Sequence, residues 1–156
     1  MNIYLVVKAL HILSSVLLVG TGFGTAFYLF FANRTRSVPA IAAVSRLVVR
    51  ADWWFTTPAV IFQPASGLWL AHMAGWPWHT PWLVASLGLY LFAGACWMPV
   101  VWLQIELAAI AGHAHTNGAI ELPEKYWQYA KTWELLGYPA FVAMLLVYFL
   151  MVLKPI

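Results

Sequence analysis

Residues 4–31 of the chain read YLVVKALHILSSVLLVGTGFGTAFYLFF, a run that is apolar almost throughout. A helix needs about 20 mostly apolar residues to cross the hydrocarbon core of a bilayer, so this run predicts a membrane helix. It is longer than the apolar segment of a signal peptide, and no basic segment precedes it. We therefore expect it to be retained as the first membrane helix of the protein.

Three further stretches of similar length and character follow, at about residues 53–74, 82–111 and 132–153. Of the 156 residues, 63% are hydrophobic and only 8% are charged, whereas soluble domains carry about 25% charged residues. The sequence thus predicts an all-α fold, a bundle of four transmembrane helices that forms a single domain over residues 1–156. Such a bundle leaves no room for a separate soluble catalytic domain.

The basic residues predict how this bundle is oriented. They gather between the first and second spans, at Arg34, Arg36, Arg46 and Arg50, and between the third and fourth, at Lys125 and Lys131. The Trp-rich turn at residues 75–81 has none, and cytoplasmic connections carry the excess of Lys and Arg. We therefore expect both termini on the periplasmic side of a bacterial inner membrane. The basic residues are too scattered for a nucleic-acid surface.

Prolines interrupt three of the predicted spans: Pro58 and Pro64 in the second, Pro99 in the third and Pro139 in the fourth. A proline inside a helix frees a backbone carbonyl, which a neighbouring group or water must then satisfy. We expect the resulting kinks to leave space for a ligand. Two other prolines, Pro39 and Pro123, are placed to begin helices in the first and third connections.

Polar and small residues of the first span fall at steps of three and four, which places them on one helical face. They are Tyr4, Lys8, His11, Ser15 and Gly22, and Leu18 completes the series. His11 lies about 10 Å below the outer end of this helix and should face the bundle. An ionisable residue at that depth suggests a functional site. The alternative is a neutral imidazole that hydrogen-bonds Ser15 or a carbonyl freed by a proline.

A lone membrane histidine suits haem better than zinc, because zinc needs three or four protein ligands and haem needs one or two axial ligands in an apolar slot. The prediction is a haem held by His11, with His72 as the second axial ligand and His79 as its competitor. Lys8, Ser15 and Gly22 would complete the cofactor site from the face of His11. His72 could equally be an interfacial residue of an aromatic belt.

Two other features of the sequence are better explained by contacts between helices than by a ligand site. Gly20 and Gly24 form a G-x-x-x-G pair, which predicts close approach of a neighbouring helix, the alternative being a flat macrocycle. Five charged residues near the inner ends of the spans can form ion pairs that hold the helices together, the alternative being a proton or propionate site. These five are Arg50, Asp52, Glu106, Lys131 and Glu134.

Several segments resemble known membrane families. Lys8-Ala9-Leu10-His11-Ile12, Phe27-Tyr28-Leu29 and the ending Val152-Leu153-Lys154-Pro155 resemble the four-helix HemJ-type protoporphyrinogen IX oxidases. Residues 96–104, CWMPVVWLQ, and the Lys-Pro ending resemble more closely a bacterial family of predicted integral membrane proteins, domain of unknown function 2269. Copper-resistance D-type membrane proteins are similar at a greater distance. The HemJ resemblance implies a haem b held by His11.

The sequence also departs from the HemJ pattern. Those enzymes carry a Lys just after a Trp in the third helix, where this chain has Trp82 followed by LVASL, and their later third-helix His is missing. Their fourth-helix Arg and Asn-Glu-x-Pro pattern is reduced to Lys131, Glu134 and a displaced Pro139. These departures affect porphyrinogen oxidation more than they affect haem binding.

The leading hypothesis is therefore a haem b-binding inner-membrane protein in electron transfer or tetrapyrrole handling, a haem-dependent oxidoreductase if it is an enzyme. Its partners would be the lipid bilayer and a membrane redox partner or tetrapyrrole, and a homo-oligomer is compatible with its apolar surface. The alternative is a non-catalytic membrane subunit or copper-handling protein, in which Cys96, Met98 or the outer histidines contact copper and His11 is a packing residue. A protoporphyrinogen IX oxidase ranks third.

Overall fold

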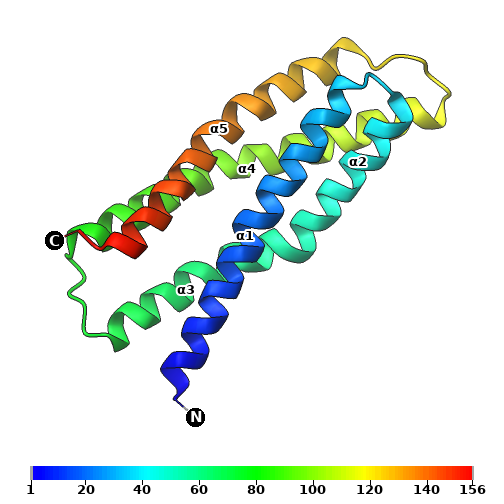
Figure 1. The fold of residues 1–156 in the computed structure, drawn as a ribbon. Coiled ribbons are helices and arrows are strands. Elements are labelled where there is room, and N and C mark those ends of the chain that lie inside the picture. The colour runs from blue at the N-terminus through cyan, green and yellow to red at the C-terminus, as the bar shows by residue number, and fades with distance from the viewer. Residues whose placement is uncertain (1, 156) are drawn as a thin grey trace.

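The computed structural model describes residues 2–155, which are helical throughout apart from short connections and contain no strand. The elements are α1 (Ile3–Arg34), α2 (Val38–Ala51), the π-helical η1 (Asp52–Thr56), α3 (Thr57–Met73), α4 (Pro81–Thr116) and α5 (Glu124–Leu153). Because α2, η1 and α3 follow one another without a break, they form one rod, and the bundle has four rods (Figure 1). Three helices, α1, α4 and α5, are long and apolar enough to cross a membrane.

The helices extend beyond the spans expected from hydrophobicity alone. The second rod begins at Val38, well before residue 53, and Pro39 occupies its first turn as expected. Likewise α5 begins at Glu124, directly after Pro123, and not near residue 132. Proline pre-sets the backbone angle of a first helical turn, where its missing N–H has no cost. Both proline-based helix starts are therefore confirmed.

The connections alternate between the two ends of the bundle (Figure 1). Residues 35–37 and 117–123 lie at one end, called here the basic end, while residues 74–80, the start of α1 and the end of α5 lie at the other, the Trp-rich end. At the Trp-rich end, the Lys154 ammonium lies 5.5 Å from the ring of Trp76 and 5.7 Å from that of Trp82. This relative placement of connections and termini is the one that the sequence predicts.

Packing is dense at the basic end and looser towards the Trp-rich end. The larger core cluster is built from α1, α2, α4 and α5 around the fully buried Tyr126, whose hydroxyl donates to Asn33 Oδ1 at 2.7 Å. A smaller cluster of Ala71, Trp82 and Leu83 closes the Trp-rich end. Along the bundle α4 packs extensively on α5, whereas α1 makes few contacts with α5. The space between α1 and α5 is therefore not closed by helix packing.

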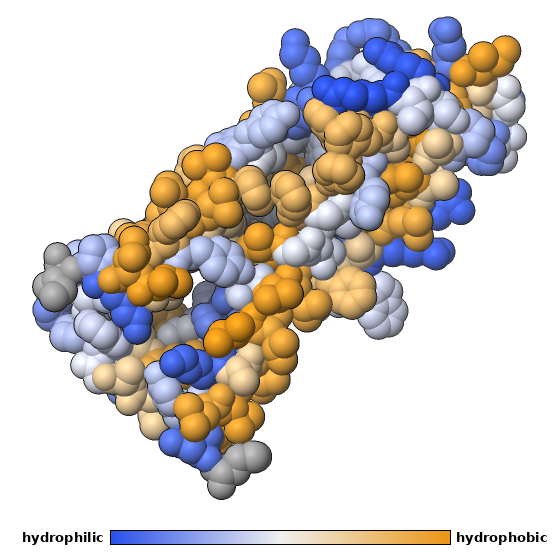
Figure 2. All heavy atoms as spheres, viewed as in Figure 1, coloured by the Kyte–Doolittle hydropathy of each residue, from blue (hydrophilic) through white to orange (hydrophobic). Residues whose placement is uncertain are grey.

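Large apolar side chains cover much of the outer surface (Figure 2), as expected of a chain whose solvent is lipid. Trp53 is 65% exposed and Trp54 77% exposed in this single chain. In a soluble protein an apolar surface of this extent would be an aggregation hazard. Against acyl chains, such a surface is the expected one.

Two prolines shape the second rod as the sequence suggests. Pro58 follows the π-helical turn, in which the Thr57 N–H donates to the Asp52 carbonyl five residues back. Pro64 has no N–H for the carbonyl of Val60, and the Tyr90 hydroxyl from α4 donates to that carbonyl at 2.7 Å. The expectation that a freed carbonyl needs a partner is confirmed at Pro64, where the partner also ties α3 to α4.

Candidate functional site

A cavity of about 380 Å³ lies between α1, the η1–α3 part of the second rod, α4 and α5. Aromatic side chains dominate its wall: Phe23, Phe27, Phe30, Phe31, Tyr90, Trp97, Trp133, Tyr138 and Phe141. The backbones of α1 and α5 lie apart, the rings of Phe23 and Phe141 stack across the gap at 5.1 Å, and Figure 2 shows the surface hollowed between these two helices. A molecule dissolved in the membrane could enter through this side without crossing water.

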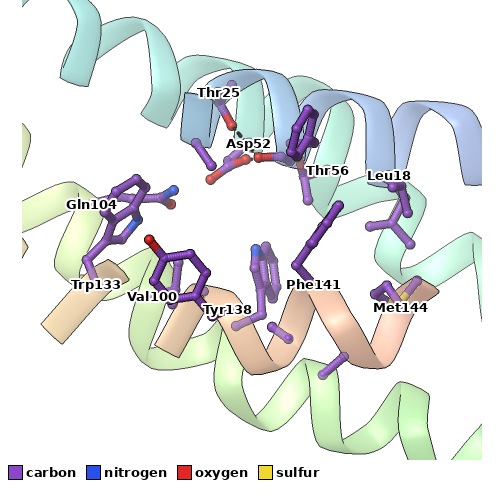
Figure 3. Close-up of a pocket in the computed structure, with 18 of the residues that line it drawn as sticks. Leu18, Thr25, Asp52, Thr56, Val100, Gln104, Trp133, Tyr138, Phe141 and Met144 are labelled. Carbon is purple, nitrogen blue, oxygen red and sulfur yellow. Dashed lines mark hydrogen bonds between the residues drawn. The ribbon is translucent and has the colours of Figure 1, made fainter. Parts of the chain in front are cut away.

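Three buried polar groups face the end of this cavity nearer the basic end (Figure 3). Asp52 is 4% exposed, Gln104 6% and Trp133 5%. The Thr56 hydroxyl donates to Asp52 Oδ1 at 2.9 Å, but Asp52 Oδ2, Gln104 Oε1 and Trp133 Nε1 have no hydrogen-bond partner. A buried polar atom without a partner is costly, so three in one cavity indicate a place for a bound molecule or water.

The local sequence explains how Asp52 comes to face inward. Asp52 is the first residue of the π turn that precedes Pro58, and Thr56 lies one turn later on the same side. π turns in otherwise α-helical rods occur frequently at functional sites. Asp52 and Gln104 also line a second cavity of about 180 Å³ between the second rod and α4, so this polar pair stands between two hollow spaces.

The charged side chains that line the large cavity are all acidic. Its two charged lining residues are Asp52 and Glu134, and no Lys, Arg or His lines it. The predicted ion-pair clasp was wrong, because within residues 2–155 no basic nitrogen lies within 4.0 Å of a carboxylate oxygen. Arg50 and Lys131 are exposed, so they extend away from the bundle while Asp52 turns into it. A propionate site is also disfavoured, since no cation faces the cavity.

His11 lies elsewhere, against α3, with a partner on each ring nitrogen. Its Nδ1 lies 2.8 Å from Ser66 Oγ and its Nε2 lies 3.1 Å from Gln63 Nε2. The Ser66 hydroxyl donates to the Phe62 carbonyl at 2.7 Å, so Ser66 accepts from Nδ1–H and the Gln63 amide donates to Nε2. His11 is thus a neutral imidazole within a hydrogen-bond network, as the structural alternative held, but with Ser66 and Gln63 as partners in place of Ser15.

Gly67 explains why α1 and α3 approach so closely at this point. A Cβ atom at residue 67 would lie 3.1 Å from His11 Cε1, so even a methyl group would press on the ring. The close-packing role predicted for Gly20 and Gly24 was wrong within the chain, because a Cβ at either position would meet nothing within 4 Å. The glycine that permits helix contact is on α3, opposite the histidine.

The other residues predicted for a cofactor site are not brought together with His11. Lys8 is exposed, with its ammonium 6.0 Å from the Tyr4 ring. Ser15 donates to the Ile12 carbonyl, and its own carbonyl accepts from Tyr148. Each of these residues therefore has a separate role in its own surroundings.

Of the remaining two predicted site residues, Gly22 lines the large cavity and His72 does not. His72 is exposed, and its ring stacks on that of Trp78 at 6.1 Å, as an interfacial residue of an aromatic belt would. Gly22 does line the large cavity, together with Leu18 from the same face of α1. His11 lies two turns, roughly 10 Å, beyond Leu18 along the helix, so it does not line the cavity.

The copper alternative finds little geometric support. Met98 is 71% exposed and Cys96 is half-buried, and neither lines the large cavity. Within the described part of the chain, no group of three or more His, Cys, Asp and Glu side chains could hold a metal ion. Soft ligands on the lipid-facing surface are ordinary packing residues here.

Sequence reasoning missed the partners of His11 and the inward position of Asp52. The partners of His11 do leave a signal in the sequence. Ser66 and Gly67 follow Gln63 by three and four residues within an apolar helix, so both lie on the same face as Gln63. The second had only a weak signal, an acidic residue six positions before Pro58. Its orientation depends on the π turn, which periodicity does not predict.

Comparisons with known proteins agree with the membrane character of the chain. No curated protein and no solved structure matches it, so the resemblances to HemJ-type oxidases and copper-resistance proteins gain no support. One family model, described as "Predicted integral membrane protein (DUF2269)", matches residues 5–155. The chain therefore belongs to this family of predicted integral membrane proteins.

Proposed function

We propose that this protein binds a lipid-soluble, mostly apolar molecule within its helix bundle. The observation that carries the proposal is the aromatic-lined cavity of about 380 Å³ that opens between α1 and α5. Ligand pockets are concave, mostly apolar and equipped with a few converging polar groups, and their volumes start at about 300 Å³. Asp52, Gln104 and Trp133 supply such polar groups at one end.

The topology that goes with this function has four membrane crossings in a bacterial inner membrane. The rod of α2, η1 and α3 would make the second crossing, since it is continuous over residues 38–73. Its basic residues favour a cytoplasmic basic end. A reporter fused at Asn117 should read cytoplasmic, and one fused at the C-terminus should read periplasmic. The reverse pair of readings would contradict this orientation.

Glycines on α4 provide a matched test of the cavity. Gly94 lines it and Gly88 does not, and a Cβ at either position meets nothing within 4 Å. Gly94→Phe should therefore fill the cavity without a clash at its Cβ, while Gly88→Phe adds the same bulk outside it. The experiment is native mass spectrometry of the protein extracted from its own membrane.

The wild-type protein and Gly88→Phe should retain a lipid-soluble molecule as a discrete added mass, and Gly94→Phe should lose it. On α1 the same contrast is available, because Gly22 lines the cavity and Gly20 does not. Absence of any retained molecule in the wild type, or equal retention by both members of each pair, would contradict the proposal.

A second candidate is haem b at His11, in electron transfer or tetrapyrrole handling with a membrane redox partner. The favouring observation is that Ser66 accepts from Nδ1–H, which leaves a lone pair on Nε2. Metal-binding histidines usually have their other ring N–H held in this way. Bound haem would supply one-electron transfer, with His11 as the axial ligand after the Gln63 amide moves aside. Such a haem would lie outside the large cavity, where Asp52 and Glu134 repel propionates.

His72 could serve as the second ligand of this haem only by leaving Trp78, and Lys8 could pair with a propionate from its exposed position. The visible spectrum of the purified protein tests this candidate. A Soret band with reducible α and β peaks should disappear in His11→Ala and persist in His79→Ala. A colourless wild-type protein after growth with added haem, or an unchanged spectrum in His11→Ala, would exclude it.

A further inference from the structure

We propose that the ligand of the large cavity is a lipophilic organic cation, with its charged group beside Asp52 and its apolar body among the aromatic rings. This inference rests on the proposed ligand-binding function. Its starting point is the Asp52 carboxylate, which is 4% exposed and has one oxygen without a partner. A carboxylate buried away from water is stable only when it is paired or hydrogen-bonded on both oxygens.

The protein itself supplies no positive charge to that carboxylate. Among residues 2–155 no basic side chain lies within ion-pair distance of Asp52. The Thr56 hydroxyl donates to Oδ1 and the Gln104 side chain lies beside the carboxyl group, while Oδ2 and Gln104 Oε1 have no hydrogen-bond partner. Two open acceptor oxygens at one point of a cavity call for a donor, and a positively charged donor also compensates the carboxylate.

The other charged and aromatic residues that line the cavity also favour a cation over an anion. Glu134 adds a second carboxylate, and no residue of the wall carries a positive charge. Aromatic faces attract cations through their ring quadrupole, most strongly where water is excluded. Tyr138 offers such a face across the cavity from Asp52 in Figure 3, and Trp97 is a second lining ring. An anionic ligand would meet two carboxylates here, whereas both carboxylates attract a cation.

The opening between α1 and α5 fits a ligand that arrives from the membrane. Apolar cations dissolve in the bilayer, where their apolar bodies lower the cost of carrying charge. The Trp133 Nε1–H would still need an acceptor, which a water or an oxygen atom of the ligand can provide. The ligand class is thus an apolar body with a single positive centre, such as an aryl or alkyl ammonium or phosphonium.

Tetraphenylphosphonium and tetraphenylborate test the charge preference, because the two ions have nearly the same shape and opposite charge. Binding is measured by equilibrium dialysis against the full-length protein in lipid nanodiscs, with empty nanodiscs as the background. We expect saturable binding of tetraphenylphosphonium and none of tetraphenylborate above background. Equal binding of the two ions, or no saturable binding of the cation, would overturn the inference.

Variants locate the site within the chain. Asp52→Asn should weaken tetraphenylphosphonium binding at least about tenfold, because removal of one partner of a buried charge pair is expensive. Glu134→Gln should weaken it less, since Glu134 is only half-buried. Glu106→Gln is the matched control, a half-buried carboxylate of α4 that does not line the cavity. Equal effects of Asp52→Asn and Glu106→Gln would remove Asp52 from the site.

The inference and the proposed function can fail separately. If native mass spectrometry shows a molecule that Gly94→Phe displaces, but tetraphenylphosphonium does not bind, the cavity is a ligand site for neutral molecules. In that case the cation inference falls and the proposed function stands. If neither experiment detects a ligand, both fall together.

Discussion

Two polar sites of this bundle differ in how many of their buried polar atoms lack a hydrogen-bond partner. His11 at the α1–α3 contact has a partner on each ring nitrogen, and its partner Ser66 is itself bonded to a carbonyl. Asp52, Gln104 and Trp133 at the cavity each keep an unpartnered polar atom. Beside His11 the unpartnered atom is Gln63 Oε1. Hydrogen bonds between facing helices hold the helices together, whereas several unpartnered atoms that face one cavity can be satisfied by another molecule.

The comparison reverses the weight that the sequence gives to the two sites. His11 looks functional in a sequence because an ionisable residue deep in a membrane helix suggests a functional site. In the structure the partners of His11 lie on the facing helix, and their positions make it a contact between helices. Asp52 looks like part of a charge clasp in the sequence, yet it is the buried carboxylate without an ion-pair partner.

The largest expected effect on stability comes from His11 at the contact between α1 and α3. His11→Ala should lower the free energy of unfolding by about 1–2 kcal/mol, because Ser66 and Gln63 lose their shared partner. Reversible unfolding in mixed detergent micelles measures this change, with His72→Ala as the control on an exposed histidine. If both variants unfold alike, His11 does not hold α1 to α3.

A smaller loss is expected at the proline-freed carbonyl of the second rod. Tyr90→Phe should lower the free energy of unfolding by about 0.5–1 kcal/mol, because the Val60 carbonyl then has no donor. Tyr138→Phe is the control, a cavity-lining tyrosine whose hydroxyl makes no hydrogen bond to residues 2–155. An equal result for the two variants in the same unfolding assay would mean that water or lipid replaces Tyr90.

The smallest expected effect is a slight rise in the free energy of unfolding. Gln104→Leu removes the unpartnered Oε1 from the cavity wall and puts an apolar side chain of similar size in its place. Without ligand, the free energy of unfolding should stay the same or rise by up to about 0.5 kcal/mol. A clear loss of stability would show that Gln104 already has a partner in the folded protein, and the contrast between the two sites would weaken.

Much of the fold could be predicted from the sequence, because hydrophobic runs and proline positions are local signals. The apolar run at residues 4–31, the helix starts at Pro39 and Pro123, and the need for a donor near Pro64 all follow from single segments. The second rod is longer than its apolar run because the amphipathic α2 continues into it through η1.

The candidate site could not be predicted in the same way, since it depends on which faces meet. The cavity exists because the backbones of α1 and α5 lie apart and meet through side chains such as Phe23 and Phe141, and no single segment encodes that gap. Gly20 and Gly24 illustrate the limit, because their spacing matches a packing motif while Gly67 makes the actual close contact. Asp52 turns inward through a π turn, which changes the helical register that a 3.6-residue period assumes.

The central claim is that the cavity beside Asp52 holds a lipophilic cation, and the anomalous scattering of arsenic tests it most directly. Crystals grown from a lipid mesophase with tetraphenylarsonium would show the position of the ion without any prior assumption about the site. The account predicts an anomalous peak inside the cavity between α1 and α5, with Asp52 as the nearest carboxylate. A peak on the outer surface of the bundle, or no peak in well-ordered crystals at saturating tetraphenylarsonium, would contradict it.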